Sequence, residues 1–202
     1  MTAASHTDET DRALLDRIRA GDRDAFEVLV RNKRQQAFRL ARRVVGQDED
    51  ARDVVQLAFL RVWRKVGSFR GGSEFDPWFH RIVVNLAIDF VRRESARRRS
   101  QTDWAGEQAR AGGSGHRALP AVLQLQEVSR IFDELSACLP PRQRAIFVLR
   151  EIEGMSTDDV AKVMGIRLST VRNHLFQART TLRRALQARY PEYVPGGKEE
   201  KP

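Results

Sequence analysis

Four side chains that can read the edges of DNA bases gather on one stretch near the C-terminus. Arg172, Asn173, Phe176 and Gln177 are one, three and four residues apart, so in a helix they share one face. Arg bonds guanine through two donors, Asn and Gln bond adenine, and Phe contacts the methyl group of thymine. Arg and Gln are also common on faces that meet only solvent. The aromatic member favours the binding interpretation, and the chemistry predicted is readout of duplex DNA.

A second group mixes aromatic, amide and cationic side chains between residues 69 and 93. Proteins that hold unpaired nucleic acid strands combine aromatic platforms for bases with cations for phosphates. Such a surface can offset the few kcal/mol that it costs to extract a base from a duplex. For the tryptophan in this group, a place in the hydrophobic core is an equally good interpretation. The candidates are Phe69, Arg70, Trp78, Phe79, Arg81, Asn85, Asp89, Arg92 and Arg93.

No comparable group predicts a catalytic or metal centre. The four histidines are scattered without ligand spacing, and His80 and His174 are expected at the surface or in a groove. Acidic residues at 48–50 and 158–159 suit the first turns of helices, where they offset the helix dipole. The single cysteine, Cys138, cannot form an internal disulfide and is expected to be a small buried apolar group. We predict no enzymatic activity, no cofactor and no metal ion.

The residues from 156 to 186 predict the element that positions the first group. Ser156 is a helix N-cap candidate, and a short helix follows over 157–164. Gly165 supplies a left-handed turn, and a second helix begins at about residue 168. The small residue Ala161, the glycine and the apolar Val171 have the spacing of a helix-turn-helix.

Apolar spacings of three and four also predict helices over 11–20, 22–45, 48–66 and 78–93, and no alternating strand pattern stands out. A Gly/Ser run at 112–115 interrupts the chain and is typical of a linker. The predicted fold is all-α, with two small helical domains joined by a flexible linker. The predicted divisions are an N-terminal segment at 1–21, a first domain at 22–99, a linker at 100–126, a second domain at 127–190 and a flexible tail at 191–202.

Charge points to a polyanionic partner for both domains. The chain has 202 residues, with 36 basic and 27 acidic side chains and a net charge of +9. Residues 21–99 carry 18 basic and 11 acidic side chains, and residues 127–190 carry 11 and 7. The sequence has no apolar run of membrane-spanning length, and its polar first residues do not predict a secretory leader, so we expect a cytoplasmic protein without membrane insertion.

Two blocks of the sequence resemble a known family. The first block resembles region 2 of sigma factors. It consists of DARDVVQLAFLRVWRKV at 50–66 followed by SFRGGSEFDPWFHRIVVNLAIDFVRR at 68–93. Region 4 resembles the block at 139–186, which begins LPPRQRAIFVLREIEGMSTDDVA. With both blocks in this order, the chain resembles the extracytoplasmic-function (ECF) group of the sigma-70 family over about residues 22–99 and 128–188.

The resemblance implies an alternative sigma factor that binds core RNA polymerase and directs promoter recognition, melting at the −10 element and transcription initiation. It implies contact with the polymerase clamp through Asp53, Gln56, Leu57 and Leu60, and contact with the flap near residues 140–150. The second group of side chains would then capture the −10 element. The −35 element would be read by Ser169, Thr170, Arg172, Asn173, Phe176, Gln177 and Arg179. The family further implies an anti-sigma factor as a partner.

Three positions depart from the common family pattern. Leu57 replaces a frequent Glu, Arg167 replaces a Ser-type cap before the recognition helix, and Gln177 replaces a frequent Arg. We expect a weakly capped recognition helix, and from Gln177 either a shifted base preference or a weaker attraction to phosphates. The alternative hypothesis is a stand-alone helix-turn-helix repressor or activator that binds palindromic sites as a dimer, but it leaves residues 50–93 without a role.

Overall fold

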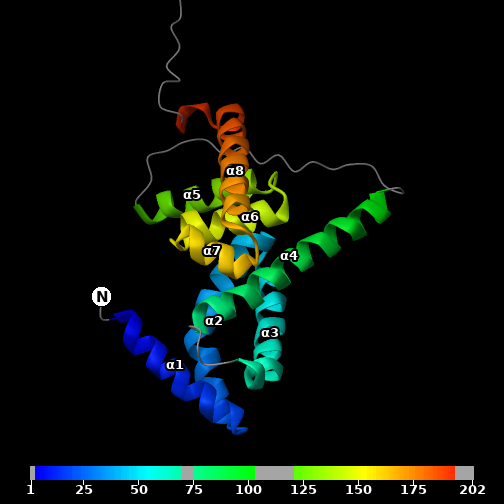
Figure 1. Ribbon diagram of the computed structural model, residues 1–202. Helices are drawn as coiled ribbons and strands as arrows, with labels where there is room; N and C mark the ends of the chain where they lie inside the picture. The colour runs from blue at the N-terminus through cyan, green and yellow to red at the C-terminus, as the bar shows by residue number, and fades with distance from the viewer. Residues whose placement is uncertain (1–2, 70–74, 103–120, 194–202) are drawn as a thin grey trace, which may run out of the picture.

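The computed structural model describes residues 3–69, 75–102 and 121–193, which form helices and connecting turns (Figure 1). The predicted all-α class is confirmed, and α2, α3, α7 and α8 lie within a few residues of their predicted bounds. The α-helices are α1 (Ala3–Arg19), α2 (Arg23–Val45), α3 (Asp48–Lys65), α4 (Phe75–Thr102), α5 (Ala121–Ser136), α6 (Pro141–Phe147), α7 (Thr157–Met164) and α8 (Leu168–Arg189). The short helical turns are η1 (Val66–Ser68), η2 (Val148–Ile152) and η3 (Pro191–Tyr193).

Helices α1 to α4 form the first half of the molecule. Asp22 caps α2 by accepting a hydrogen bond from the Ala25 amide at 3.0 Å, and Gly46 ends it in the left-handed conformation with φ 93°. The N-terminal segment is part of this bundle, because Leu14 and Leu15 of α1 are buried in the same core. The predicted division at residue 21 therefore cuts through one packed unit.

Helices α6 to α8 form the second half, and α5 packs on the C-terminal part of α8. Ser156 caps α7 through the Asp159 amide, and Gly165 ends α7 with φ 62°, so the predicted helix-turn-helix is confirmed. Cys138 is exposed, contrary to the prediction, because it falls in the turn between α5 and α6. Among the described residues, no helix is long and apolar enough to cross a membrane.

The two halves share one hydrophobic core. Helix α4 lies between α1–α3 and α5–α8 (Figure 1), and it packs against α2 and α3 on one side and α6 and α7 on the other. The two predicted domains pack against each other in this structure, because the apolar positions of α4 cover two faces and each face has its own partner. The linker expected at 100–126 overlaps α4 and α5 at its ends, and its residues 103–120 lie outside the described part.

Polar contacts join the halves at the end of α2. The Arg144 Nε atom donates to the Arg43 carbonyl at 2.8 Å, and the Arg43 guanidinium forms an ion pair with Glu153. Arg42 lies 3.0 Å from an Asp133 carboxylate oxygen. These contacts join α2 to α5, to α6 and to the residue after η2, so the second half has a defined position on the first.

Candidate nucleic-acid and polymerase interfaces

Helix α4 presents one exposed stripe between its two packed faces. Every residue from 79 to 88 is buried except Arg81 and Asn85, and Asp89 and Arg92 continue the exposed line at intervals of three and four. Trp78 stands half-buried at its N-terminal end. The structure thus brings together five of the side chains that the sequence predicted for single-strand contact. Arg93 is exposed beside them, and Arg70 lies outside the described residues.

Two of the predicted contact residues are part of the core instead. Phe79 is fully buried and stacks on Phe75, with ring centroids 5.5 Å apart and planes 12° apart. Phe69 is also buried, and its ring lies 4.9 Å from that of Trp78. In this structure, both side chains lie behind the half-buried Trp78, and a contact of either ring with DNA stays a prediction. The helical period of the sequence indicates that Phe79 is buried, because this residue falls on the same face of α4 as Val83 and the other core residues.

A buried ion-pair cluster lies beside these aromatic rings. The Lys33 ammonium is 2.5 Å from an Asp11 carboxylate oxygen and 2.7 Å from an Asp76 oxygen, and both Lys33 and Asp11 are buried. Burial by itself lowers the pKa of Lys33, but the two carboxylates outweigh burial and raise that pKa above its ordinary value. Sequence reasoning missed this cluster, since its members are 22 and 43 residues apart along the chain.

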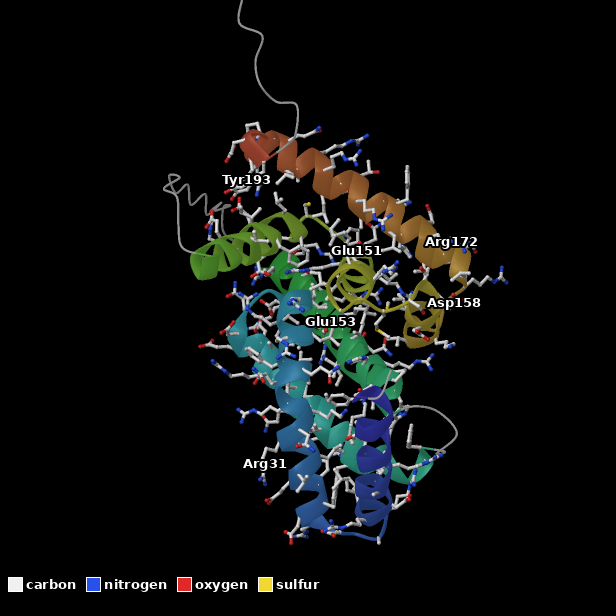
Figure 2. All side chains as sticks on the ribbon, turned by 90° about the vertical axis from the view of Figure 1, so that its left-hand side faces the viewer. Arg31, Glu151, Glu153, Asp158, Arg172 and Tyr193 are labelled. Carbon is white, nitrogen blue, oxygen red and sulfur yellow. The ribbon has the colours of Figure 1, made fainter. Side chains whose placement is uncertain are left out.

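The second exposed stripe runs along α8. Val171, Leu175 and Ala178 are buried, whereas Phe176 is 71% exposed on the opposite face. Arg172 lies near the N-terminal end of this helix (Figure 2). The other predicted side chains share the exposed side, except Thr170, which is half-buried; they are Ser169, Asn173, Gln177 and Arg179.

Neighbouring elements hold two polar side chains of the α8 stripe. The Gln143 amide of α6 donates to the Gln177 amide oxygen at 2.8 Å, and Arg179 pairs with Glu151 of η2 at 2.6 Å. Arg167 precedes α8 without a side-chain cap, as its departure from the family pattern predicted. The stripe is thus positioned by packing and by side chains from outside the helix.

A third surface lies on α3. The predicted polymerase-contact residues Asp53, Gln56, Leu57 and Leu60 are all exposed and share one face of the helix. Leu57 and Leu60 are 43% and 46% exposed, which is unusual for leucine. An apolar groove between α2 and α3 adjoins this face, with Val55 and Phe59 in its lining and basic residues around it. One of these is Arg31, which points outward from α2 (Figure 2).

The stripe on α4 meets the second half of the molecule at one point. A side-chain carbon added at Gly165 would lie 2.5 Å from the Arg81 Nη2 atom, so the helix-turn-helix turn touches this stripe directly. His80, next in the chain, is buried rather than exposed, contrary to the prediction. The Gln36 amide donates to its Nε2 atom at 3.0 Å, and desolvation lowers the pKa of His80 despite the nearby Asp76 and Glu153 carboxylates.

The described residues include no group of three or more His, Cys, Asp or Glu side chains that could hold a metal ion. The acidic residues at 48–50 and 158–159 lie in the first turns of α3 and α7, as predicted. Desolvation, followed by the nearby Arg142, lowers the pKa of His174, which is half-buried in α8.

Comparison with known proteins identifies the same regions. A family model described as "Sigma-70 region 2" matches residues 29–97, and one described as "Sigma-70, region 4" matches residues 129–182. The RNA polymerase sigma-H factor of Pseudomonas aeruginosa is 35% identical over 188 residues, which are 90% of this chain and 96% of that protein. The ECF RNA polymerase sigma-E factor of Escherichia coli K12 is 34% identical over 182 residues, which are 88% of this chain and 95% of that protein.

Two solved structures share the fold. CnrH, solved in complex with the cytosolic domain of CnrY, aligns with a TM-score of 0.63 at 26% identity, covering 89% of this chain and 99% of that one. The sigma factor RpoE of Bartonella quintana, solved with the anti-sigma factor NepR, aligns with a TM-score of 0.60 at 20% identity, covering 81% and 98%. Both alignments span the two halves described above.

Proposed function

Since this chain belongs to the ECF group of the sigma-70 family, we propose that its three exposed surfaces divide the contacts of a sigma factor among core polymerase and two promoter elements. The chain is an alternative sigma factor, which binds RNA polymerase and promoter DNA and directs transcription initiation. Its role is regulatory rather than catalytic. The stand-alone regulator is not favoured, because the family models match both regions and not the helix-turn-helix alone.

The α3 face is the proposed seat on the polymerase clamp. Exposed leucines at 57 and 60 offer apolar area that the bundle itself does not use, and Asp53 and Gln56 flank them with polar groups. An apolar centre with a polar rim is the usual composition of a protein interface. In this arrangement, Leu57 contributes apolar contact where relatives frequently carry Glu. We further propose that the flap is met near residues 140–150.

The α4 stripe is the proposed site of −10 capture. The assignment of function to individual residues rests on this line of exposed side chains. Trp78 offers a ring for stacking, Asn85 can hydrogen-bond a base, and Arg81 and Arg92 can neutralise phosphates. The α8 stripe is the proposed −35 reader, with Arg172 and Phe176 among its exposed side chains.

In the packed arrangement, the chain cannot contact the −10 and −35 promoter elements at the same time. Their names place them about 25 base pairs apart, and at about 3.4 Å per pair the separation along straight duplex is about 85 Å. Here α4 touches α7 directly, and Arg81 adjoins Gly165. Engagement of a full promoter therefore requires the halves to separate. We propose that an anti-sigma partner, of the kind solved with RpoE of Bartonella quintana, acts on this chain.

Transcription with purified core polymerase tests the −10 assignment. Asn85→Ala removes an exposed amide from the stripe, so it should reduce run-off transcript from a duplex promoter about tenfold, equivalent to about 1.4 kcal/mol. On a template already unpaired at −10, the reduction should be under about threefold. Asn32→Ala, the same change on an exposed position of α2, serves as the matched control. Equal losses on both templates would contradict a role in opening.

Binding to duplex −35 sequences tests the α8 assignment. Arg172→Ala should cost about 1–3 kcal/mol at one base position and relax the preference there. Arg183→Ala, on the next part of the same helix, should instead weaken binding to all sequences alike, as loss of a phosphate contact does. A uniform loss from Arg172→Ala over a library of −35 sequences would count against base readout.

A further inference from the structure

We infer that α1 belongs to the −10 machinery: Arg19 and Asp11 are positioning residues that hold the rings behind Trp78. Helix α1 lies outside the segment matched by the region 2 family model, which begins at residue 29. The inference rests on the proposed role of the α4 stripe. It adds a connection from a different helix to the one aromatic side chain of that stripe.

The contacts of Arg19 converge on Phe69. The Arg19 Nε atom donates to the Val66 carbonyl at 3.2 Å, and its Nη2 atom donates to the carbonyl of Phe69. The guanidinium carbon also lies 5.9 Å from the centroid of the Phe69 ring, which is within cation–π range. One side chain thus fixes both the backbone and the ring of the residue against which Trp78 packs at 4.9 Å.

Asp11 acts on the other side of the same indole. It neutralises the buried Lys33 ammonium, which also pairs with Asp76 and lies 5.6 Å from the centroid of the Phe75 ring. The Phe75 ring centroid is 5.8 Å from that of Trp78. Because an uncompensated buried charge is strongly destabilising, the Lys33 position depends on its carboxylate partners. The two rings that contact Trp78 are therefore each held by a cation, and each cation is on α1 or paired to it.

Stability of the bundle does not require Arg19. Helix α1 is already attached by Leu14, Leu15 and Ile18, which are 6%, 1% and 3% exposed. The Arg19 side chain is 27% exposed, and partly exposed charged contacts contribute little to unfolding free energies. Its contacts instead restrict the surroundings of a tryptophan that must meet DNA. A ring held in its binding orientation loses less conformational entropy when a base engages it.

The first test reports on Trp78 without polymerase or DNA. In a full-length Trp63→Phe/Trp104→Phe background, Trp78 is the remaining tryptophan, and its fluorescence quenching by acrylamide measures its packing. Arg19→Ala should raise the quenching constant about twofold, whereas Arg19→Lys should raise it less because the cation over Phe69 remains. Arg17→Ala is the matched control, since Arg17 lies on the same helix but pairs with Asp22 away from the rings. Unchanged quenching in Arg19→Ala would overturn the inference.

The second test separates this inference from the proposed function. With core polymerase on a duplex promoter, Arg19→Ala should lower open-complex formation three- to tenfold, with a change under twofold on a −10-unpaired template. Arg19→Ala/Trp78→Ala should be no worse than Trp78→Ala alone, because both changes act through one ring. If Trp78→Ala impairs opening but Arg19→Ala behaves as Arg17→Ala does, the inference fails alone. If Trp78→Ala itself has no effect, the proposed −10 surface fails.

Asp11→Asn extends the test to the second side of the indole. It keeps the shape of the side chain but removes the charge, leaving Asp76 to pair with Lys33. We expect increased quenching of Trp78 and a selective loss on duplex promoters. A lowered melting temperature with equal losses on both templates would assign Asp11 to folding and overturn its positioning role.

Discussion

The stripes on α4 and α8 are both lines of exposed side chains on long helices, but they are supported differently. On α8 the aromatic side chain, Phe176, is 71% exposed and the stripe faces outward. On α4 the tryptophan is half-buried, and Phe69, Phe75 and Phe79 are buried behind it. A reader of intact duplex needs a helix face that fits a groove, whereas a surface that separates strands must withstand the cost of unstacking.

The polar supports of the two stripes differ in the same way. Gln177 and Arg179 of α8 are held by exposed partners, which are replaceable at low cost in stability. Behind α4, the ion pair of Lys33 with Asp11 is buried, and loss of one partner leaves an expensive charge. Mutations of the buried residues behind α4 should therefore affect folding and function together, and mutations of the exposed α8 side chains should affect function alone.

The largest expected effect is a contrast between two phenylalanines. Phe79→Ala removes a fully buried ring that stacks on Phe75, so it should lower the free energy of unfolding by about 3–5 kcal/mol. Phe176→Ala, the same change on α8, should alter stability by less than about 0.5 kcal/mol and weaken binding to −35 duplexes. Urea unfolding and DNA binding of both variants make the comparison. Similar stability losses would show that the two stripes are not supported differently.

The sequence predicted the helices whose ends are marked locally. Asp22 and Ser156 act as caps, and Gly46 and Gly165 end helices in the left-handed conformation, so α2 and α7 were located closely. The stripe on α4 was also predictable, because amide and basic side chains interrupt an otherwise apolar run. Local signals of this kind need no knowledge of what the helix packs against.

The errors arose where the partner of a side chain decides its role. An aromatic residue in a DNA-binding motif reads equally as a contact or as core, and only packing placed Phe69 and Phe79 inside. The bonds of Arg19 join residues 47 and 50 positions away, which no local pattern specifies. Likewise, the apolar faces of α4 predicted burial but not that α6 and α7 would cover one of them.

A smaller effect is expected at the contact between the halves. Glu153→Ala removes the ion pair with Arg43, a partly buried contact worth about 1 kcal/mol, and should favour separation of the halves. The matched control is Glu151→Ala, because Glu151 pairs with Arg179 within the second half. Fluorescence energy transfer from a dye on the exposed Cys138 to one on an Asn32→Cys variant reports the separation.

Energy transfer should fall in Glu153→Ala and remain unchanged in Glu151→Ala. Added salt should lower the transfer of the unmodified chain toward that of Glu153→Ala, because screening weakens the same pair. Equal transfer in both variants would mean that apolar packing of α4 against α7 holds the halves by itself. The halves would then differ only in their surfaces and not in how they are joined.

The smallest expected effect is on pH dependence, and it again contrasts α4 with α8. His80 is buried, with Asp76, Glu153 and Lys33 around it, and desolvation lowers its pKa below the ordinary value of about 6.5. The unfolded chain therefore takes up a proton first as the pH falls, so stability is full above about pH 6.5 and declines below it. His80→Gln should flatten this decline between about pH 7 and about pH 5, measured by urea unfolding. His174→Gln should flatten it less, because His174 is only half-buried.

The Asp22 carboxylate does not obscure that window. Backbone and arginine hydrogen bonds lower the pKa of Asp22, so its contribution is lost only below about pH 4. If His174→Gln removed as much acid sensitivity as His80→Gln, desolvation would be equal in the two helices. The contrast between the buried support behind the α4 stripe and the exposed face of α8 would then not extend to the histidines of the two helices. A larger effect at His80 would place the acid-sensitive point of the fold where Glu153 meets α4, beside the −10 stripe.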